Sequence, residues 1–319
     1  MSNLQAIAAR MGDRRWIWSF LGAFGVWLAT ILFTEGKGAG DVLTAALSFS
    51  TFTVIVGIGQ MFVITTGPGN VDLSIPSTIA LAGGVAMKIM GGSDGLIIVG
   101  LAASIGSGLA VGAFNYGLIR VLQIPPIIAT LSSSFLVMSC AISYGRGLQV
   151  KPPSSFADFT TAQIAGLPIL SICAVLFAIL MAIILERTIY GRSTLAIGQN
   201  MRAAWLAGVK VERTRCITYM MSGAFAGLCG ALLAGFSGGN ALNMGEEYLL
   251  ASIAVVVIGG TSVAGGRANV PGIWGAALFL YLLVTMLNIF GVSAGVRLVL
   301  TGLIIIGMIT MAGGEKTGR

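Results

Sequence analysis

Apolar runs of about twenty residues recur along almost the whole of this chain. A run of that length is long enough to cross the roughly 30 Å hydrocarbon core of a bilayer as a helix. The chain is therefore predicted to be an all-α polytopic membrane protein with about ten transmembrane helices. The predicted spans are 16–34, 43–64, 72–90, 96–120, 125–145, 166–185, 216–236, 249–266, 270–290 and 295–312.

Composition excludes a soluble domain and several kinds of chemistry. Charged residues make up 9% of the chain, against roughly 25% in a soluble domain. The chain has no histidine, which removes the commonest general base and metal ligand. Its four cysteines form no C-x-x-C pair and are expected to be packing residues rather than disulfides. The first fifteen residues are polar and basic, so no cleavable signal peptide is expected.

The distribution of basic residues sets the expected orientation. If the N-terminus is inside and each span crosses once, the outer side holds only Lys37, Lys88, Arg146, Lys151 and Arg297. The remaining 13 of the 18 basic residues lie inside, as the positive-inside rule requires. Both termini are therefore expected in the cytoplasm of a bacterial inner membrane. The net charge of +7 is attributed to topology, and no nucleic-acid partner is expected.

These predictions divide the chain into three parts. Residues 1–15 form a cytoplasmic segment, 16–312 a single transmembrane domain, and 313–319 a cytoplasmic tail. The most polar segment within the domain is a cytoplasmic loop at 187–215. An outer loop at 147–166 is expected to be a surface loop or a short external helix.

The segment 65–84, "TTGPGNVDLSIPSTIALAGG", places helix-breaking residues and an aspartate between apolar runs. An aspartate at a lipid-facing helix centre costs about 2.5–3.5 kcal/mol on insertion scales. One interpretation is that Asn70 or Asp72 caps the following helix at the positive end of its dipole. The other is a role in a pathway or gate. Both roles stay open, and the candidates for the second are Asn70, Asp72, Ser74, Asn115, Thr261 and Ser262. For Asn115 the structural role is a hydrogen bond between helices.

The sequence 200–209, "NMRAAWLAGV", predicts a short helix within the cytoplasmic loop. Its residues favour helix, and Gly208 is typical of the position just after a helix. Trp205 and Leu206 supply apolar side chains. Such a helix can dock in a groove of a cytoplasmic partner or lie on the membrane interface, and the residues alone do not decide between these roles.

Glycine and other small residues mark three further features. The segment 257–266, "VIGGTSVAGG", allows sharp bends or close backbone approach, and no P-loop signature occurs in the chain. Two stripes of small residues at four-residue spacing predict close helix packing, within a subunit or between subunits. They are Gly100, Ser104, Gly108 and Gly112, and Gly223, Gly227, Ala231 and Gly235. A weak likeness between 77–84 and 253–260 suggests two inverted five-helix halves.

Four motifs occur in an order and at a spacing that resemble a known family. They are "GNVDLSIPSTIALAGG", "FNYGLI…QIPPIIATL", "AIGQNMRAAWLAGV" and "VIGGTSVAGG". Together they resemble permease subunits of bacterial ATP-binding-cassette importers for ribose, xylose, arabinose and related sugars. The wider family includes permeases for nucleosides and branched-chain amino acids. The resemblance therefore indicates the class of transporter more specifically than the substrate.

The resemblance implies a mechanism and a set of partners. Two permease chains, identical or different, pair across a central pathway, and a periplasmic binding protein delivers a small polar solute. Two cytoplasmic ATPase subunits use ATP and Mg, so this chain is expected to bind no cofactor and to be no enzyme. The ATPase subunits would grip a coupling helix at 200–209. Its contact residues would be Asn200, Arg202, Ala203, Ala204, Trp205 and Gly208.

This sequence departs from the family pattern at three positions. Met201 replaces an acidic residue, which leaves the ATPase partner open. Pro76 and Tyr116 stand where sugar permeases tend to have glycine. These two differences argue against a common pentose as the substrate. They are also compatible with a chain that forms one half of a heterodimeric permease pair.

Two other classes fit less well. An ion-coupled secondary transporter needs ionisable residues in the membrane, and Asp72 is the one candidate. An intramembrane enzyme needs a catalytic constellation, and the sequence offers no clear one.

Overall fold

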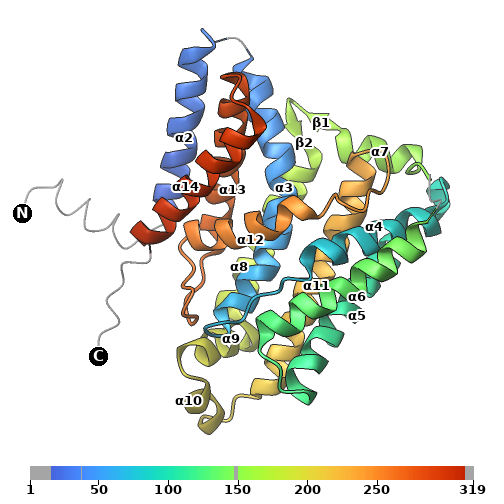
Figure 1. Ribbon diagram of the computed structural model, residues 1–319, viewed down its shortest axis with the longest axis vertical. Helices are drawn as coiled ribbons and strands as arrows, with labels where there is room; N and C mark the ends of the chain where they lie inside the picture. Colours follow the sequence, from blue (N-terminus) through green and yellow to red (C-terminus); the bar gives the residue numbers. More distant parts are fainter. Residues whose placement is uncertain (1–15, 37, 147–149, 313–319) are drawn as a thin grey trace, which may run out of the picture.

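The computed structural model describes residues 16–36, 38–146 and 150–312 and is almost entirely helical (Figure 1). The predicted terminal segments 1–15 and 313–319 lie outside the described residues. The first half contains α2 (Trp16–Phe33), α3 (Ala39–Thr65), α4 (Ile75–Met90), η1 (Asp94–Leu96), α5 (Ile97–Val121), α6 (Pro126–Gly145) and α7 (Ser154–Thr161). The second contains α8 (Ile169–Arg187), α9 (Ile189–Gln199), α10 (Met201–Leu206), α11 (Val211–Phe236), α12 (Glu246–Ile258), α13 (Val270–Ile289) and α14 (Ala294–Ala312).

The helical membrane fold is confirmed, with a smaller set of full-length spans. Within the described residues, six helical stretches are long and apolar enough to cross a membrane. They are Ala39–Thr65, Asp94–Val121, Pro126–Gly145, Ile169–Arg187, Val211–Phe236 and Val270–Ile289. The other predicted spans fall on α2, α4, α12 and α14.

The predicted span 249–266 is wrong in its second half. Helix α12 has 13 residues and ends at Ile258, a length of about 20 Å at 1.5 Å per residue. The chain leaves the helix because glycine adopts left-handed backbone angles here, first at Gly260, where φ is 92°. Helix α4 is also short, with 16 residues that begin at Ile75.

The predicted outer loop 147–166 holds a short helix, although 147–149 lie outside the described residues. Helix α7 occupies part of it, and a two-stranded antiparallel hairpin, which was not predicted, follows. The strands are β1 (Gln163–Ile164) and β2 (Leu167–Pro168), with Gln163 opposite Pro168. In Figure 1 the hairpin and α7 lie at the end of the molecule opposite α9 and α10.

The core forms around α3 and α11. Every residue of α3 from Ser50 to Thr65 is buried. The two small-residue stripes pack against each other within one chain. The backbones approach so closely that a Cβ atom on Gly108 would overlap the Gly223 carbonyl oxygen. The hydroxyl of Ser104 also donates a 2.6 Å hydrogen bond to the carbonyl of Gly227. Of the two predicted packing modes, the stripes therefore serve the one within the subunit.

Candidate functional sites: a buried polar network and an exposed helix

Asp72 is buried in the loop 66–74 that joins α3 to α4, with 1% of its surface exposed. One carboxylate oxygen, Oδ1, accepts hydrogen bonds from the Ser74 peptide N–H (3.0 Å), the Ser74 hydroxyl (2.6 Å) and Asn115 Nδ2 (3.4 Å). The other, Oδ2, accepts from the Ser222 hydroxyl at 2.7 Å. These donors come from the loop, α5 and α11. These four hydrogen bonds satisfy the carboxylate without lipid contact. They offset the free-energy cost of removing a charged group from water.

The loop 66–74 doubles back along α3. The peptide N–H of Asp72 donates to Gln60 Oε1 at 3.2 Å, and Gln60 lies five residues before the end of α3 at Thr65. Asp72 is therefore level with the interior of α3. Irregular backbone at such a depth is tolerated where protein surrounds it, and Gln60 and Asp72 are both almost fully buried.

The interpretation that Asn70 or Asp72 caps α4 is wrong, because neither residue occupies the N-cap position and no side chain caps this helix. Ser74 is the N-cap residue of α4 and makes no side-chain cap to the helix. Asp72 bonds the peptide N–H of Ser74, so its carboxylate stabilises the turn immediately before α4. Asn70 takes no part in this turn. Its Nδ2 donates to the Gly67 carbonyl, and its Oδ1 accepts from Arg215 Nη2 at 3.0 Å and from the Tyr219 hydroxyl at 3.3 Å.

Asn115 makes the hydrogen bonds between helices that were one of its two predicted roles. Its Nδ2 donates to the Ser74 hydroxyl at 2.7 Å, and its Oδ1 accepts from the Ser133 hydroxyl on α6. Thr130, also on α6, accepts from the Leu73 peptide N–H at 3.1 Å. The buried polar network is defined by Gln60, Asn70, Asp72, Ser74, Asn115, Thr130, Ser133, Tyr219 and Ser222. It ties the loop to α3, α5, α6 and α11.

Several members of this network, and Arg215 which bonds to it, were not singled out from the sequence. Arg215, Tyr219 and Ser222 are spaced by four and then three residues, so they share one face of α11. That polar spacing within an apolar helix was the available signal. Gln60 and Ser133 carried no comparable pattern.

Thr261 and Ser262 lie apart from the network, in the loop 259–269 between α12 and α13. The Thr261 hydroxyl accepts from the Asn269 peptide N–H at 3.3 Å, and the Ser262 peptide N–H donates to the Arg267 carbonyl at 3.1 Å. The structure thus brings Asn70, Asp72, Ser74 and Asn115 together. It places the other two pathway candidates in a second glycine-rich loop.

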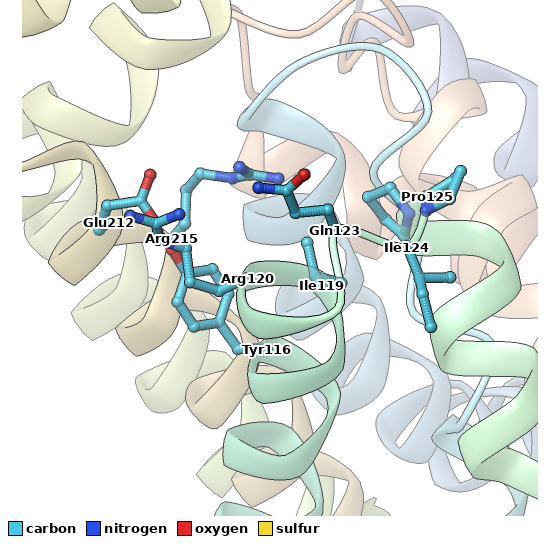
Figure 2. A pocket seen from close by; sticks show the side chains of 9 residues that line it. Tyr116, Ile119, Arg120, Gln123, Ile124, Pro125, Glu212 and Arg215 are labelled. Carbon is cyan, nitrogen blue, oxygen red and sulfur yellow. Dashed lines mark hydrogen bonds and ion pairs between the residues drawn. The ribbon is translucent and has the colours of Figure 1, made fainter.

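A cavity of about 320 Å³ adjoins the network (Figure 2). Its lining residues come from α5, the α5–α6 turn, the first residue of α6 and α11, and they include Gln123 and Arg215. On its wall, Glu212 accepts a 2.6 Å hydrogen bond from the Tyr116 hydroxyl and pairs with Arg120 Nε at 2.7 Å. Arg215 connects this cavity to the network, because the same guanidinium donates to Asn70.

Helix α10 is the predicted short helix, shorter than expected at six residues. Asn200 caps it, since its Oδ1 accepts from the Ala203 peptide N–H at 2.9 Å. Gly208 follows with a φ of 84°, and the Val209 peptide N–H donates to the Ala204 carbonyl at 3.0 Å. This is the hydrogen bonding of a glycine-terminated helix end.

The two faces of α10 differ. Ala204 is buried and packs with Ile197 and Val211. Trp205 and Leu206 are 66% and 71% exposed, and Arg202, Ala203 and Gly208 are exposed too. A cavity of about 560 Å³ lies beside the helix and is lined by Trp205, Gly208 and the residues 209–213 together with Arg120. The helix thus offers an apolar and basic surface, and of the predicted contact residues only Ala204 faces inward.

No cluster of three or more His, Cys, Asp or Glu residues that could hold a metal occurs within the described ranges. The chemistry offered by the buried polar network is hydrogen bonding, and α10 offers an exposed apolar and basic surface. Residues 42–309 match a family described as the branched-chain amino acid transport system permease component.

The chain belongs to this permease family. It is 34% identical to the ribose import permease protein RbsC of Bacillus subtilis (strain 168), over 79% of this chain and 78% of that protein. It is 32% identical to the L-arabinose transport system permease protein AraH of Escherichia coli (strain K12), over 86% and 81%. The autoinducer 2 import system permease protein LsrC of Enterobacter sp. (strain 638) is 28% identical over 83% and 76%. No solved structure matches.

The family resemblance inferred from the four motifs is therefore confirmed. The chain is a membrane-spanning permease subunit of an importer of the ATP-binding-cassette type. Its role in that importer is that of a permease, which forms a passage across the membrane.

Proposed function

We propose that this permease conducts a monosaccharide or a related polyol into the cytoplasm. The observation that supports this most directly is similarity over about four-fifths of the chain to permeases named for ribose and L-arabinose. The buried polar network agrees with a pathway wall that has little affinity of its own, because its side chains hydrogen-bond mainly to one another, with Gln60 Nε2 as the exception. Specificity then resides mainly in a periplasmic binding protein that delivers the solute.

The proposed transporter contains a second permease chain, identical or related, and two cytoplasmic ATPase subunits that use ATP and Mg. The ATPase subunits dock on α10, where Trp205 and Leu206 are exposed beside a cavity of about 560 Å³. Arg202, Lys210 and Arg213 surround this apolar surface and are exposed. A groove with an apolar floor and acidic rim on the ATPase would complement it.

The proposed topology has ten membrane crossings with both termini in the cytoplasm. Contacts at the two ends of the molecule support it. At the proposed outer end, Asp94 accepts a hydrogen bond from the Ser155 peptide N–H, and the Thr44 hydroxyl donates to the Gly166 carbonyl. At the inner end, the Gly266 peptide N–H donates to the Thr65 carbonyl. Loop 259–269 thus completes the crossing that the short helix α12 begins.

Two inverted halves, α2–α6 and α8–α14 without the cytoplasmic helices α9 and α10, fit this topology. The third membrane helix of each half is the short one, α4 and α12. Helix α5 packs on α11 and helix α13 packs on α3, which are corresponding pairs with the halves exchanged. Inverted repeats with broken helices are typical of transporters.

Reconstitution tests the proposed function. The permease, a candidate partner ATPase and a candidate binding protein are placed in liposomes, and uptake of labelled pentoses, hexoses and polyols is measured with and without ATP. ATP-dependent uptake of one of these solutes that needs the binding protein is the expected result. Uptake of a branched-chain amino acid instead would favour the substrate in the family's description, and uptake by the permease alone would contradict an ATP-driven importer.

A further inference from the structure

Three segments that are distant in the sequence meet at one point near α10. The Gly266 peptide N–H donates to the Thr65 carbonyl at 3.0 Å. The Gln199 side chain donates from Nε2 to the Gly266 carbonyl at 3.3 Å. We refer to Thr65, Gly198, Gln199, Gly265 and Gly266 as the glycine junction. It joins the end of α3, the end of α9 and the loop 259–269.

The approach at this junction requires glycine. A Cβ atom on Gly198 would overlap both the Thr65 carbonyl oxygen and the Gly266 peptide nitrogen. A Cβ on Gly266 would lie 2.8 Å from the Gln199 peptide nitrogen. Gly265 has a φ of 86°, and a Cβ there would lie 2.6 Å from the Gly67 Cα atom. The three segments therefore touch mainly through their backbones, and the Gln199 side chain adds one hydrogen bond to the Gly266 carbonyl.

Each segment leads to a feature already described. Gln199 is the last residue of α9, and Asn200, the cap of α10, follows it directly. Thr65 is the last residue of α3, and the loop 66–74 with Asp72 follows it. Gly266 lies in the loop that connects α12 to α13. The end of α9, which leads directly into α10, therefore contacts both the loop 259–269 and the residue that precedes the loop 66–74.

We propose that the glycine junction passes movement of α10 to both glycine-rich loops, with Gly198 as its positioning residue. The inference rests on the proposed docking of an ATPase to α10. A stiff contact between backbones moves as a unit, whereas long side chains would absorb a displacement by changing rotamer. Coupling between distant sites needs such a packed element that both sites can bias. The junction also gives the motif "VIGGTSVAGG" a role beyond helix termination.

Gly198→Ala tests the junction in the complete importer in liposomes. Its matched control is Gly117→Ala, because Gly117 is also helical and a Cβ there would meet no atom within 4 Å. In Gly198→Ala we expect unchanged co-purification of the ATPase and unchanged basal hydrolysis of ATP. Solute uptake is expected to fall about tenfold, which is the scale of a substantial coupling energy. Wild-type uptake in Gly198→Ala would overturn the inference.

A distance measurement keeps the test independent of whether Gly198→Ala folds. Spin labels are placed at Arg192 on α9 and Val263 in the loop 259–269, both exposed, in a chain with native Gly198 and its four cysteines replaced by alanine. The distance between the labels is expected to stay the same in the ADP-bound and ATP-bound importer. A distance that changes with the nucleotide would show that the two segments move separately and would overturn the inference.

The two proposals fail in different ways. If the wild-type importer takes up no solute with ATPase, ATP and binding protein present, the proposed function is wrong before any variant is examined. If the wild type imports and Gly198→Ala imports equally well, only the junction is wrong.

Discussion

The carboxylate of Asp72 accepts a 2.7 Å hydrogen bond from the hydroxyl of Ser222, which lies 150 residues further along the chain. Both side chains are 1% exposed. This contact joins a loop that carries the family motif to the middle of α11. A residue whose placement in lipid would be costly thus becomes a buried link between the two halves of the chain.

Asp72→Asn is expected to fold and to lose transport. The amide keeps the shape and can still accept from Ser74, while the Ser222 hydroxyl can turn to accept from the new Nδ2. Replacing charge-assisted bonds by neutral ones lowers the free energy of unfolding by about 1 kcal/mol. Thermal unfolding in detergent and uptake in liposomes measure the two effects. The exposed residue Asp94 provides the control Asp94→Asn. If Asp72→Asn keeps full uptake, the charge of Asp72 has no role in transport, and only its structural role in hydrogen bonding remains.

Asp72→Ala separates shape from hydrogen bonding at the same position. Alanine removes the acceptor of the donors from Ser74 and Ser222, at a cost of about 1–3 kcal/mol for each one that stays unpaired, whereas Asn115 Nδ2 keeps its 2.7 Å hydrogen bond to the Ser74 hydroxyl. We therefore expect a much lower unfolding temperature and lower expression than for Asp72→Asn. Equal stability of the two variants would contradict a structural role for the network.

Gly108→Ala is expected to destabilise the packing of α5 on α11. A Cβ atom there would overlap the Gly223 carbonyl oxygen, and overpacking of a tight contact costs about 1–3 kcal/mol. Gly106→Ala, on the same helix but with no atom within 4 Å of its Cβ, is the matched control. The unfolding temperature in detergent should fall for the first variant and not for the second. Similar behaviour of both would argue against the close crossing.

The sequence allowed α10 to be predicted in position and termination, because both signals are local. Asn200 caps the helix through a residue three positions away, and Gly208 ends it with a left-handed backbone. The end of α12 was not predicted, because "VVVIGG" continues an apolar run. Its termination depends on glycine conformations, and hydropathy does not report these.

Only some residues of the buried polar network could be predicted from the sequence. Asp72 and Asn115 were visible as polar residues in apolar surroundings. Their partners Ser222 and Ser133 are ordinary serines in membrane helices, and tertiary packing alone brings them to the carboxylate and the amide. The packing mode of the glycine stripes was left open for the same reason, since spacing defines a helix face but not the helix it meets.

The proposed orientation predicts which sites react with a membrane-impermeant thiol reagent. In a chain whose own cysteines are replaced by alanine, Lys151→Cys should react in spheroplasts with an intact membrane. Arg192→Cys should react only after the membrane is opened, because α9 lies at the proposed cytoplasmic end. Both positions are exposed, so access to solvent is matched. The opposite pattern would reverse the orientation, and labelling of both in intact spheroplasts would contradict the topology.

Trp205→Ala is expected to weaken binding of the ATPase without unfolding the permease. The Trp205 side chain is 66% exposed, so its removal opens no cavity in the core. A tryptophan that enters a partner's pocket contributes about 2 kcal/mol or more, roughly thirtyfold in Kd. Binding of the purified ATPase to the permease in nanodiscs measures the effect. Ile189→Ala, which alters an isoleucine that is 79% exposed outside α10, is the control. Ala204→Glu is a poorer test, because Ala204 is buried and a charge there would disrupt α10 itself. If Trp205→Ala and Ile189→Ala bind the ATPase equally well, α10 is not the docking helix.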